Sequence, residues 1–182
     1  HGEASLQGAI IGLAQNFVGA NNINLLDPIG QFGTRLQGGK DAASCRYIHT
    51  ALTPLSQIIF NKEDFPIFEY IEDDGLKVEP LHYAPIIPLI LVNGCTGIGT
   101  GFSSNIPSFN PKDIINNLKK LINKEPVDEM IPWYMGFNGT IEKLSENSYI
   151  TRGCYDVIDK NTVEITELPV GKWTDSYKEY LE

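Results

Sequence analysis

The sequence predicts an α+β fold, with helices concentrated in the first part of the chain and strands in the second. Apolar residues recur at helical spacing near the N-terminal end, whereas an alternation of apolar and polar residues begins after Pro66. The chain has 182 residues, of which 42% are hydrophobic and 20% charged. This composition is typical of a globular protein, and the length is enough for one good core or two modest ones.

The first part is expected to hold two helices with a glycine-rich ribbon between them. Residues 3–18 place apolar side chains three and four positions apart, which predicts an amphipathic helix that ends at Gly19. Residues 23–41 contain a proline and several glycines, and this composition favours a loop or β-ribbon. Thr53 and Pro54 are a typical helix cap and first residue. The side chains of this second helix expected in a core are Leu55, Ile58 and Ile59.

The second part is expected to be mainly strands. Residues 67–71 alternate and lead through a turn at 73–75 into a partner strand, and the apolar run 86–92 is interpreted as a buried strand. Asn110 and Pro111 predict the start of a helix. Further predicted elements are antiparallel strands around 148–151 and 162–165 and a last helix from Trp173. We place the boundary between the two parts near residues 85–92.

The charge and cysteine content limit the possible functions. The net charge is −9, with 14 basic and 23 acidic side chains. Residues 1–60 have three of each sign, so the acidity lies in the remainder of the chain, and nucleic-acid affinity depends on local cations. No apolar run approaches the roughly 20 residues of a membrane span. Three scattered cysteines predict free thiols rather than a disulfide framework or a zinc site.

An arginine and a tyrosine stand together at Arg46 and Tyr47, just after the glycine-rich run 30–40. A tyrosine hydroxyl can attack a phosphodiester when a neighbouring guanidinium holds the phosphate. The dipeptide alone is weak evidence, because most such pairs have no catalytic role. A second glycine-rich run, residues 94–101, presents Ile98 between glycines. It lacks the lysine and Ser/Thr of a phosphate-binding P-loop, which disfavours a nucleotide site.

Several motifs follow one another along nearly the whole chain. They are His1-Gly2-Glu3, residues 13–19, Pro28-Ile29-Gly30-Gln31-Phe32-Gly33-Thr34-Arg35, residues 38–41, Arg46-Tyr47-Ile48, residues 85–88, Asn93-Gly94, residues 97–101, Gly139-Thr140-Ile141 and residues 164–169. In this order they resemble the breakage-reunion region of type IIA DNA topoisomerases, of the eukaryotic and large-DNA-virus kind. The resemblance implies that residues 1–88 form a winged-helix domain and that residues 89–182 begin a mixed α/β tower domain.

The resemblance also implies a mechanism and a set of site residues. Tyr47 would attack a DNA backbone phosphate and form a transient 5′-phosphotyrosyl link, while Arg46 holds the phosphate and His1 binds it or moves a proton. Ile98 would wedge between base pairs and bend the duplex, recovering the unstacking cost through backbone contacts. The remaining candidates for DNA contacts are Gln15, Asn16, Arg35, Lys40 and Thr100.

Cofactors and partners follow from the same resemblance. The whole enzyme would use Mg²⁺ and ATP, both bound by domains outside this sequence, and would act on double-stranded DNA as a homodimer. No metal site is expected within these residues, and no membrane partner. The sequence begins inside a family motif and is interpreted as a piece of a longer protein. By itself, the fragment is expected to bind DNA weakly and not to cut it.

Some positions depart from the family pattern. Cys45 stands where a proline commonly precedes the Arg-Tyr pair, His49 replaces an aromatic residue, and Cys95 and Thr96 replace a small residue and an acid. These differences predict a divergent member, such as one from a large cytoplasmic DNA virus of the African swine fever virus kind. The expected location is the host cytoplasm for a viral protein and the nucleus for a cellular one.

Two alternatives to the enzyme remain open from the residues. The first is a non-enzymatic winged-helix module that bends DNA through Ile98. The second is a nucleotide-binding domain built on the run 94–101. Substitution of Tyr47 by phenylalanine separates the enzyme from the bending module, and ATP binding tests the nucleotide-binding alternative.

Overall fold

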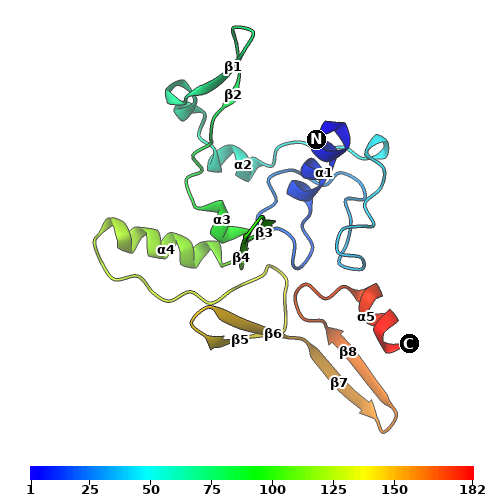
Figure 1. Cartoon of the computed structure of the whole chain (residues 1–182). Helices are drawn as coiled ribbons and strands as arrows, with labels where there is room; N and C mark the ends of the chain where they lie inside the picture. Colours follow the sequence, from blue (N-terminus) through cyan, green and yellow to red (C-terminus); the bar gives the residue numbers. More distant parts are fainter.

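The computed structural model describes residues 1–182, and it consists of short helices and hairpins spread around a small centre (Figure 1). Four helices and two hairpins follow in the order α1 (Gly2–Ala14), α2 (Pro54–Ile59), β1 (Tyr70–Asp73), β2 (Leu76–Pro80), α3 (Leu89–Val92), β3 (Cys95–Gly99), β4 (Phe102–Ile106) and α4 (Pro111–Ile122). Two more hairpins and a helix complete the chain: β5 (Thr140–Ser145), β6 (Ser148–Arg152), β7 (Cys154–Asp159), β8 (Thr162–Glu167) and α5 (Thr174–Leu181).

The predicted first helix is shorter than expected. It ends at Ala14 rather than near residue 18, because Gln15 takes an extended conformation with ψ of 131°. The side-chain amide of Asn21 then donates to the backbone oxygens of Gly12 and Gln15, at 2.7 and 2.8 Å. These bonds satisfy carbonyl groups that a continuing helix would otherwise pair. Phe17, predicted to lie on the helix, instead packs edge-on against Trp173.

Both predicted helix caps are confirmed. The backbone N–H of Ser56 donates to the Thr53 hydroxyl, and that of Lys112 donates to the Asn110 carboxamide, each followed by proline at the first helical position. The burial of the second helix differs from the prediction. Ile59 is buried, whereas Leu55 and Ile58 are exposed, so only one side of α2 packs against the rest of the chain.

The apolar run 86–92 is not a strand, and that prediction was wrong. Residues Leu89–Val92 form one turn of helix, with Pro88 at its N-cap, and the backbone N–H groups of Leu91 and Val92 donate to the Pro88 carbonyl. A short apolar run fits a buried strand and a buried helix equally well. The prolines at 85 and 88 favour the turn, since each lacks the N–H group that a strand ladder needs.

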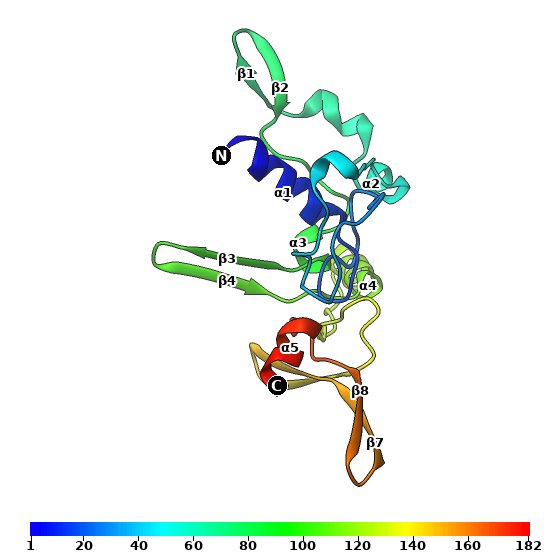
Figure 2. The same ribbon diagram turned by 90° about the vertical axis from the view of Figure 1, so that its right-hand side faces the viewer.

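The strands form four separate two-stranded antiparallel hairpins and no larger sheet. The turn between β1 and β2 lies at Asp74 and Gly75, both with positive φ, as the predicted turn requires. The strand predicted for residues 67–71 starts only at Tyr70, and Ile67 is the last residue of a 3-10 helix, Lys62–Ile67. In two perpendicular views the hairpins β1–β2, β3–β4 and β7–β8 point away from the centre in three different directions (Figures 1 and 2).

The core is small for a chain of this length. Its buried apolar side chains are Ala14, Phe32, Ile59, Val92 and Ile114. The accessible surface is 13071 Å² for 20.2 kDa, whereas surface scaling gives about 9,000 Å² for a compact protein of that mass. Many large apolar side chains are exposed as a result. None of the helices is both long and apolar enough to cross a bilayer.

A buried asparagine joins the segments at the centre. The side-chain amide of Asn22 donates to the backbone oxygens of Val92, Phe109 and Trp133, and its oxygen accepts from the N–H of Met135. These four bonds satisfy backbone groups that would otherwise be buried without partners. They also link residues on both sides of position 88, where the boundary between the two parts is predicted.

Candidate DNA-cleavage site

Tyr47 is the last residue of a short 3-10 turn, Cys45–Tyr47, that follows the glycine-rich loop. Its backbone N–H donates to the Ser44 carbonyl at 2.9 Å, which fixes the turn. The tyrosine side chain is 73% exposed and the Arg46 side chain is exposed too. Arg46 takes part in none of the ion pairs of the chain. Two consecutive residues, one with a guanidinium that forms no ion pair and one with a phenol, are therefore both open to solvent.

The loop formed by residues 30–41 is called the glycine loop below, and both of its ends are held near this turn. Ile29 and His49 form an antiparallel bridge, and the N–H of Ala43 donates to the Gln31 carbonyl at 2.9 Å. A Cβ on Gly30 would lie 2.9 Å from the Ile48 side chain, so this position accommodates only glycine without movement. The base of the glycine loop thus rests against the residue that follows Tyr47.

The glycine loop is closed by contacts within itself. The backbone N–H and the hydroxyl of Thr34 donate to the two carboxylate oxygens of Asp41, at 2.8 and 2.5 Å. These bonds lower the pKa of the Asp41 carboxyl, the Thr34 hydroxyl being the larger cause. Gly33 approaches Gly39 so closely that a Cβ would lie 2.6 Å from the backbone of Gly39.

Gln15 and Arg35 face the protein rather than solvent. The Gln15 amide donates to the carbonyls of Phe32 and Gly39, at 3.0 and 3.2 Å, and so ties the two sides of the glycine loop to the end of α1. The Arg35 guanidinium forms an ion pair with Glu167 and donates to the Leu168 carbonyl at 2.6 Å. In this state both side chains hold the glycine loop in place, and their predicted DNA contacts stay predictions.

Three more predicted site residues are exposed. Lys40 belongs to the glycine loop, Asn16 follows the end of α1, and His1 precedes its first turn. Lys40 forms no ion pair, so its ammonium group is available to an anion. The side chain of His1 is not a cap for α1.

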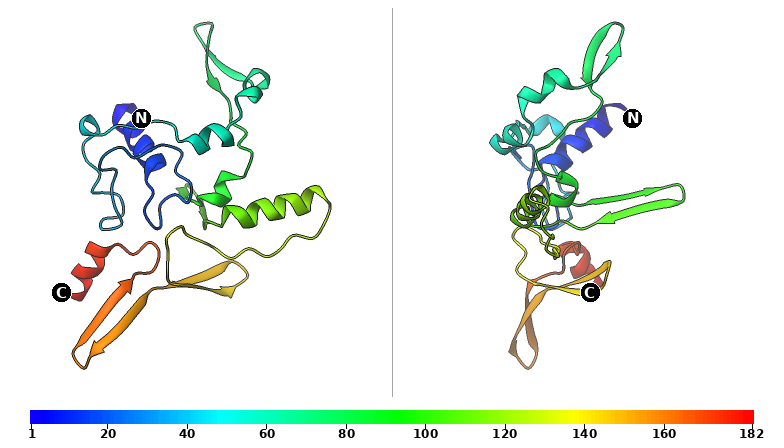
Figure 3. Two further views of the ribbon diagram at one scale, coloured as in Figure 1. Left: turned by 180° about the vertical axis from the view of Figure 1, so that it is seen from behind. Right: turned by 90° about the vertical axis from the view of Figure 1, so that its left-hand side faces the viewer.

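The second glycine-rich run forms the hairpin β3–β4, which stands clear of the rest of the molecule (Figures 2 and 3). Ile98 lies opposite Ser103 near the tip, and its side chain is 90% exposed. Thr100 and Gly101 form the turn, with φ of +79° at Gly101. Residues 95–106 contain no charged side chain, so this hairpin presents no carboxylate to a phosphate backbone.

Comparison with known proteins decides the family. The whole chain, residues 1–182, matches the family of the A-type subunit of DNA gyrase/topoisomerase IV. The chain belongs to this family. It is 57% identical over 182 residues to DNA topoisomerase 2 of Plasmodium falciparum and 56% identical over 179 residues to that of Drosophila melanogaster, covering 100% and 98% of this chain. It is 52% identical to DNA topoisomerase 2 of Acanthamoeba polyphaga mimivirus, again over all of the chain.

The structure agrees with that of a solved family member. The crystal structure of the Plasmodium falciparum topoisomerase II DNA-binding, cleavage and re-ligation domain matches with a TM-score of 0.96 and 57% identity, over 100% of this chain and 25% of that one. The chain is therefore a fragment of that domain in a type II topoisomerase. It spans 13%, 12% and 14% of the three relatives named above.

Nowhere in the chain do three His, Cys, Asp or Glu side chains come together in a group that could hold a metal ion. The residues present thus do not fit a magnesium site, although the family implies magnesium for the whole enzyme.

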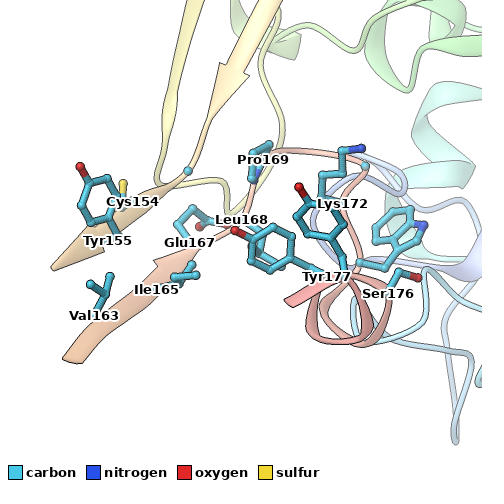
Figure 4. A pocket seen from close by; sticks show the side chains of 14 residues that line it. Cys154, Tyr155, Val163, Ile165, Glu167, Leu168, Pro169, Lys172, Ser176 and Tyr177 are labelled. Carbon is cyan, nitrogen blue, oxygen red and sulfur yellow. The ribbon is translucent and has the colours of Figure 1, made fainter. Parts of the chain in front are cut away.

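Two residues of this family member escaped the sequence analysis. Glu167 is buried at the end of β8, and Trp173 lies under Gly38 and Phe17. The signal for Glu167 was present, since residues 164–169 belong to the matching motifs, but a lone carboxylate does not reveal its partner. Both residues border a groove of ≈ 770 Å³ between the hairpin β7–β8 and α5, shown in Figure 4. Neither Tyr47 nor Ile98 lines this groove.

Proposed function

We propose that Tyr47 is the nucleophile of a type IIA topoisomerase that breaks and rejoins DNA. The observation that supports this most directly is the exposed pair of Arg46 and Tyr47 on a fixed turn in a member of this family. An exposed tyrosine can reach a phosphate in a duplex, and the adjacent guanidinium offsets the charge that develops on it.

The reaction is a transesterification. The phenolic oxygen of Tyr47 forms a bond to phosphorus as the bond to the 3′ oxygen breaks, which leaves the 5′ end joined to the enzyme. The proton lost from the phenol passes to a base, for which we propose His1, and the departing 3′ oxygen takes a proton from water to become a hydroxyl. The reverse attack reseals the strand, so the phosphate ester bond is conserved throughout.

The finer organisation belongs to the same proposal. Residues 1–88 are a winged-helix domain and residues 89–182 the start of a tower domain. Two chains form a homodimer that cuts both strands of a duplex. Mg²⁺ and ATP bind other domains, and no step above passes through either. Lys40, Asn16 and Thr100 contact the DNA backbone.

The source is also a proposal. We favour a large DNA virus, with the enzyme acting in the host cytoplasm, because of the unusual residues at 45, 49, 95 and 96. The mimivirus relative, at 52%, falls within the 50–57% range of the relatives from cells, so identity does not separate the two origins. Localising the protein in infected or uninfected cells would separate them.

Covalent trapping of the full-length enzyme tests the mechanism. Supercoiled plasmid and Mg²⁺ are mixed with the unmodified enzyme or with Tyr47→Phe, the protein is denatured, and DNA-linked peptides are mapped. We expect an adduct on Tyr47 that is lost in the variant while DNA binding is retained. An adduct that survives the substitution, or none in the unmodified enzyme, would instead favour a module that bends DNA through the exposed Ile98.

A further inference from the structure

Arg35 and Glu167 are distant in sequence but form an ion pair that is largely shielded from solvent. The side chain of Glu167 is 5% exposed and that of Arg35 is 23% exposed. One guanidinium nitrogen pairs with the Glu167 carboxylate and another donates to the carbonyl of Leu168. A forked cation that meets two acceptors in this way is held in one geometry, which a single ammonium group cannot reproduce.

Arg35 is the only cation that pairs with Glu167. The second carboxylate oxygen accepts from the backbone N–H of Asn138 at 3.1 Å and faces no basic side chain. Loss of Arg35 would leave a buried negative charge without a partner, which costs far more than loss of an exposed pair. Glu167 thus keeps the guanidinium, and the glycine loop with it, at one position.

The segment after Glu167 holds the glycine loop by further contacts. The N–H of Asp175, in the first turn of α5, donates to the Leu36 carbonyl at 3.0 Å, and the Gln37 amide donates to the Asp175 carboxylate at 3.0 Å. The Trp173 ring lies against Gly38, where any Cβ would overlap the indole. The glycine loop comes down onto the start of α5 when the molecule is seen from the front and from behind (Figures 1 and 3).

The position of the glycine loop matters because the nucleophile follows it directly. Its base rests on Ile48, and Lys40 is an exposed residue within it. A displacement of the loop would move Lys40 relative to Tyr47, and misplacement of reacting groups by about 1 Å can cost a hundredfold in rate. The contacts of residues 167–175 therefore act on the cleavage site from a distance.

We propose that Arg35, Glu167 and Trp173 are positioning residues that set the glycine loop for DNA cleavage. None of the three touches the reacting phosphate. The proposal rests on the proposed role of Tyr47. In this proposal Arg35 positions the glycine loop, whereas the sequence predicted that it contacts DNA. The two roles predict opposite effects of substituting Glu167 on the amount of covalent adduct.

The test uses the full-length enzyme with Glu167→Gln as the first variant. The glutamine keeps the size and the acceptor for Asn138 but removes the charge that holds Arg35. We expect the covalent adduct to fall about tenfold at equal DNA occupancy, because the loop, and not DNA affinity, is affected. If Arg35 bound a phosphate directly, releasing it from Glu167 would leave the adduct unchanged or raise it.

A second variant, Arg35→Ala, measures the salt dependence of DNA binding. Each phosphate contact contributes about 0.9 to the slope of log affinity against log salt concentration. We expect an unchanged slope together with the same loss of adduct as in Glu167→Gln, and no further loss in the double variant. A slope reduced by about one unit would overturn the proposal in favour of a direct contact.

Control variants distinguish failure of the positioning proposal from failure of the proposed function. Arg152→Ala removes an exposed pair with Glu142, at 3.4 Å, and should leave the adduct unchanged. Circular dichroism and DNA binding establish that each variant is folded, and Arg35→Lys gives a milder change that keeps the charge. If Tyr47→Phe abolishes the adduct but Glu167→Gln does not lower it, only the positioning proposal fails. If the adduct survives Tyr47→Phe, the proposed function fails.

Discussion

The two glycine-rich segments of the chain are held in opposite ways. The glycine loop, residues 30–41, is tied to α1 through Gln15, to itself through Thr34 and Asp41, and to the segment before α5 through Arg35. The hairpin β3–β4 is held by its own ladder and projects freely (Figure 2). Glycine serves close approach in the first segment, whereas Gly97 in the second has nothing within 4 Å.

This difference predicts that the two segments respond differently to substitution. Changes far from the glycine loop can shift it, because many residues hold it in place. Changes near the tip of the hairpin should affect DNA binding and leave the fold unchanged, because Ile98 is almost fully exposed.

The largest effect should come from glycine to alanine in the glycine loop. Gly38→Ala places a Cβ inside the Trp173 ring and forces a left-handed residue, with φ of +63°. We expect a loss of about 3 kcal/mol in the free energy of unfolding, from overpacking and the left-handed backbone together. Urea unfolding followed by tryptophan fluorescence measures it.

Gly97→Ala is the matched control on the hairpin. Its Cβ would enter open space and its φ lies outside the left-handed region, so the change should stay within about 0.5 kcal/mol. Equal losses in the two variants would mean that the hairpin is as constrained as the glycine loop, and the comparison would fail.

The sequence alone predicted those features of the fold that are determined by residues close together in the chain, such as helix caps and turns. The caps at Thr53 and Asn110 and the turn at Asp74 use short-range hydrogen bonds and backbone preferences that are local properties. The run 86–92 was misassigned because a short apolar run is compatible with either a strand or a helix. Its burial was overestimated as well, since Ile86 and Ile90 are exposed and only Val92 is buried. The end of α1 was misplaced because the side chain of Asn21, beyond the helix, completes its last turn.

The site could be predicted only in part for a similar reason. An arginine before a tyrosine and an isoleucine between glycines are visible as motifs, and both lie exposed. Gln15 and Arg35 resemble DNA contacts in the same way, since polar residues near a nucleophile are natural candidates. Their actual partners, the carbonyls of the glycine loop and Glu167, are set by how distant segments pack, which no local pattern contains.

The next largest effect is expected for a substitution at the tip of the hairpin, and it should change DNA binding and bending but not protein stability. Ile98→Ala removes most of an exposed apolar side chain, and we expect the stability of the protein to change by less than about 0.5 kcal/mol. The affinity of the full-length enzyme for duplex DNA should fall about tenfold, because the wedge loses roughly 1.5 kcal/mol of apolar burial. Energy transfer between dyes at the duplex ends measures the bend, which should decrease.

Ile98→Leu is the control for size and should preserve the bend. An unchanged bend in Ile98→Ala would show that the hairpin does not wedge. A large loss of stability would show that its tip contacts the protein, and either result would weaken the contrast between the two segments.

The smallest expected effect is the dependence of the glycine loop on acidic pH. Hydrogen bonds from Thr34 hold the pKa of Asp41 below its usual 3.8, so the carboxylate stabilises the glycine loop fully above that value. This contribution is lost as the pH falls through the lowered pKa, because below it the Asp41 carboxyl is protonated in the folded chain as well as in the unfolded one. Between pH 5 and pH 8 this contribution should therefore be constant, and titration of Asp41 should cause no pH dependence of the loop.

Fluorescence of Trp173 reports the loop, because the indole lies under Gly38. In a Trp133→Phe background we expect a constant signal at neutral pH and a change only below about pH 4. Asp41→Asn should remove the part of that change that depends on the carboxylate, and Thr34→Val should move it to higher pH by removing the main hydrogen bond. A midpoint that stays in place in Thr34→Val would show that the Thr34 hydroxyl does not control the titration, and the glycine loop would then depend on Gln15 and Arg35 alone.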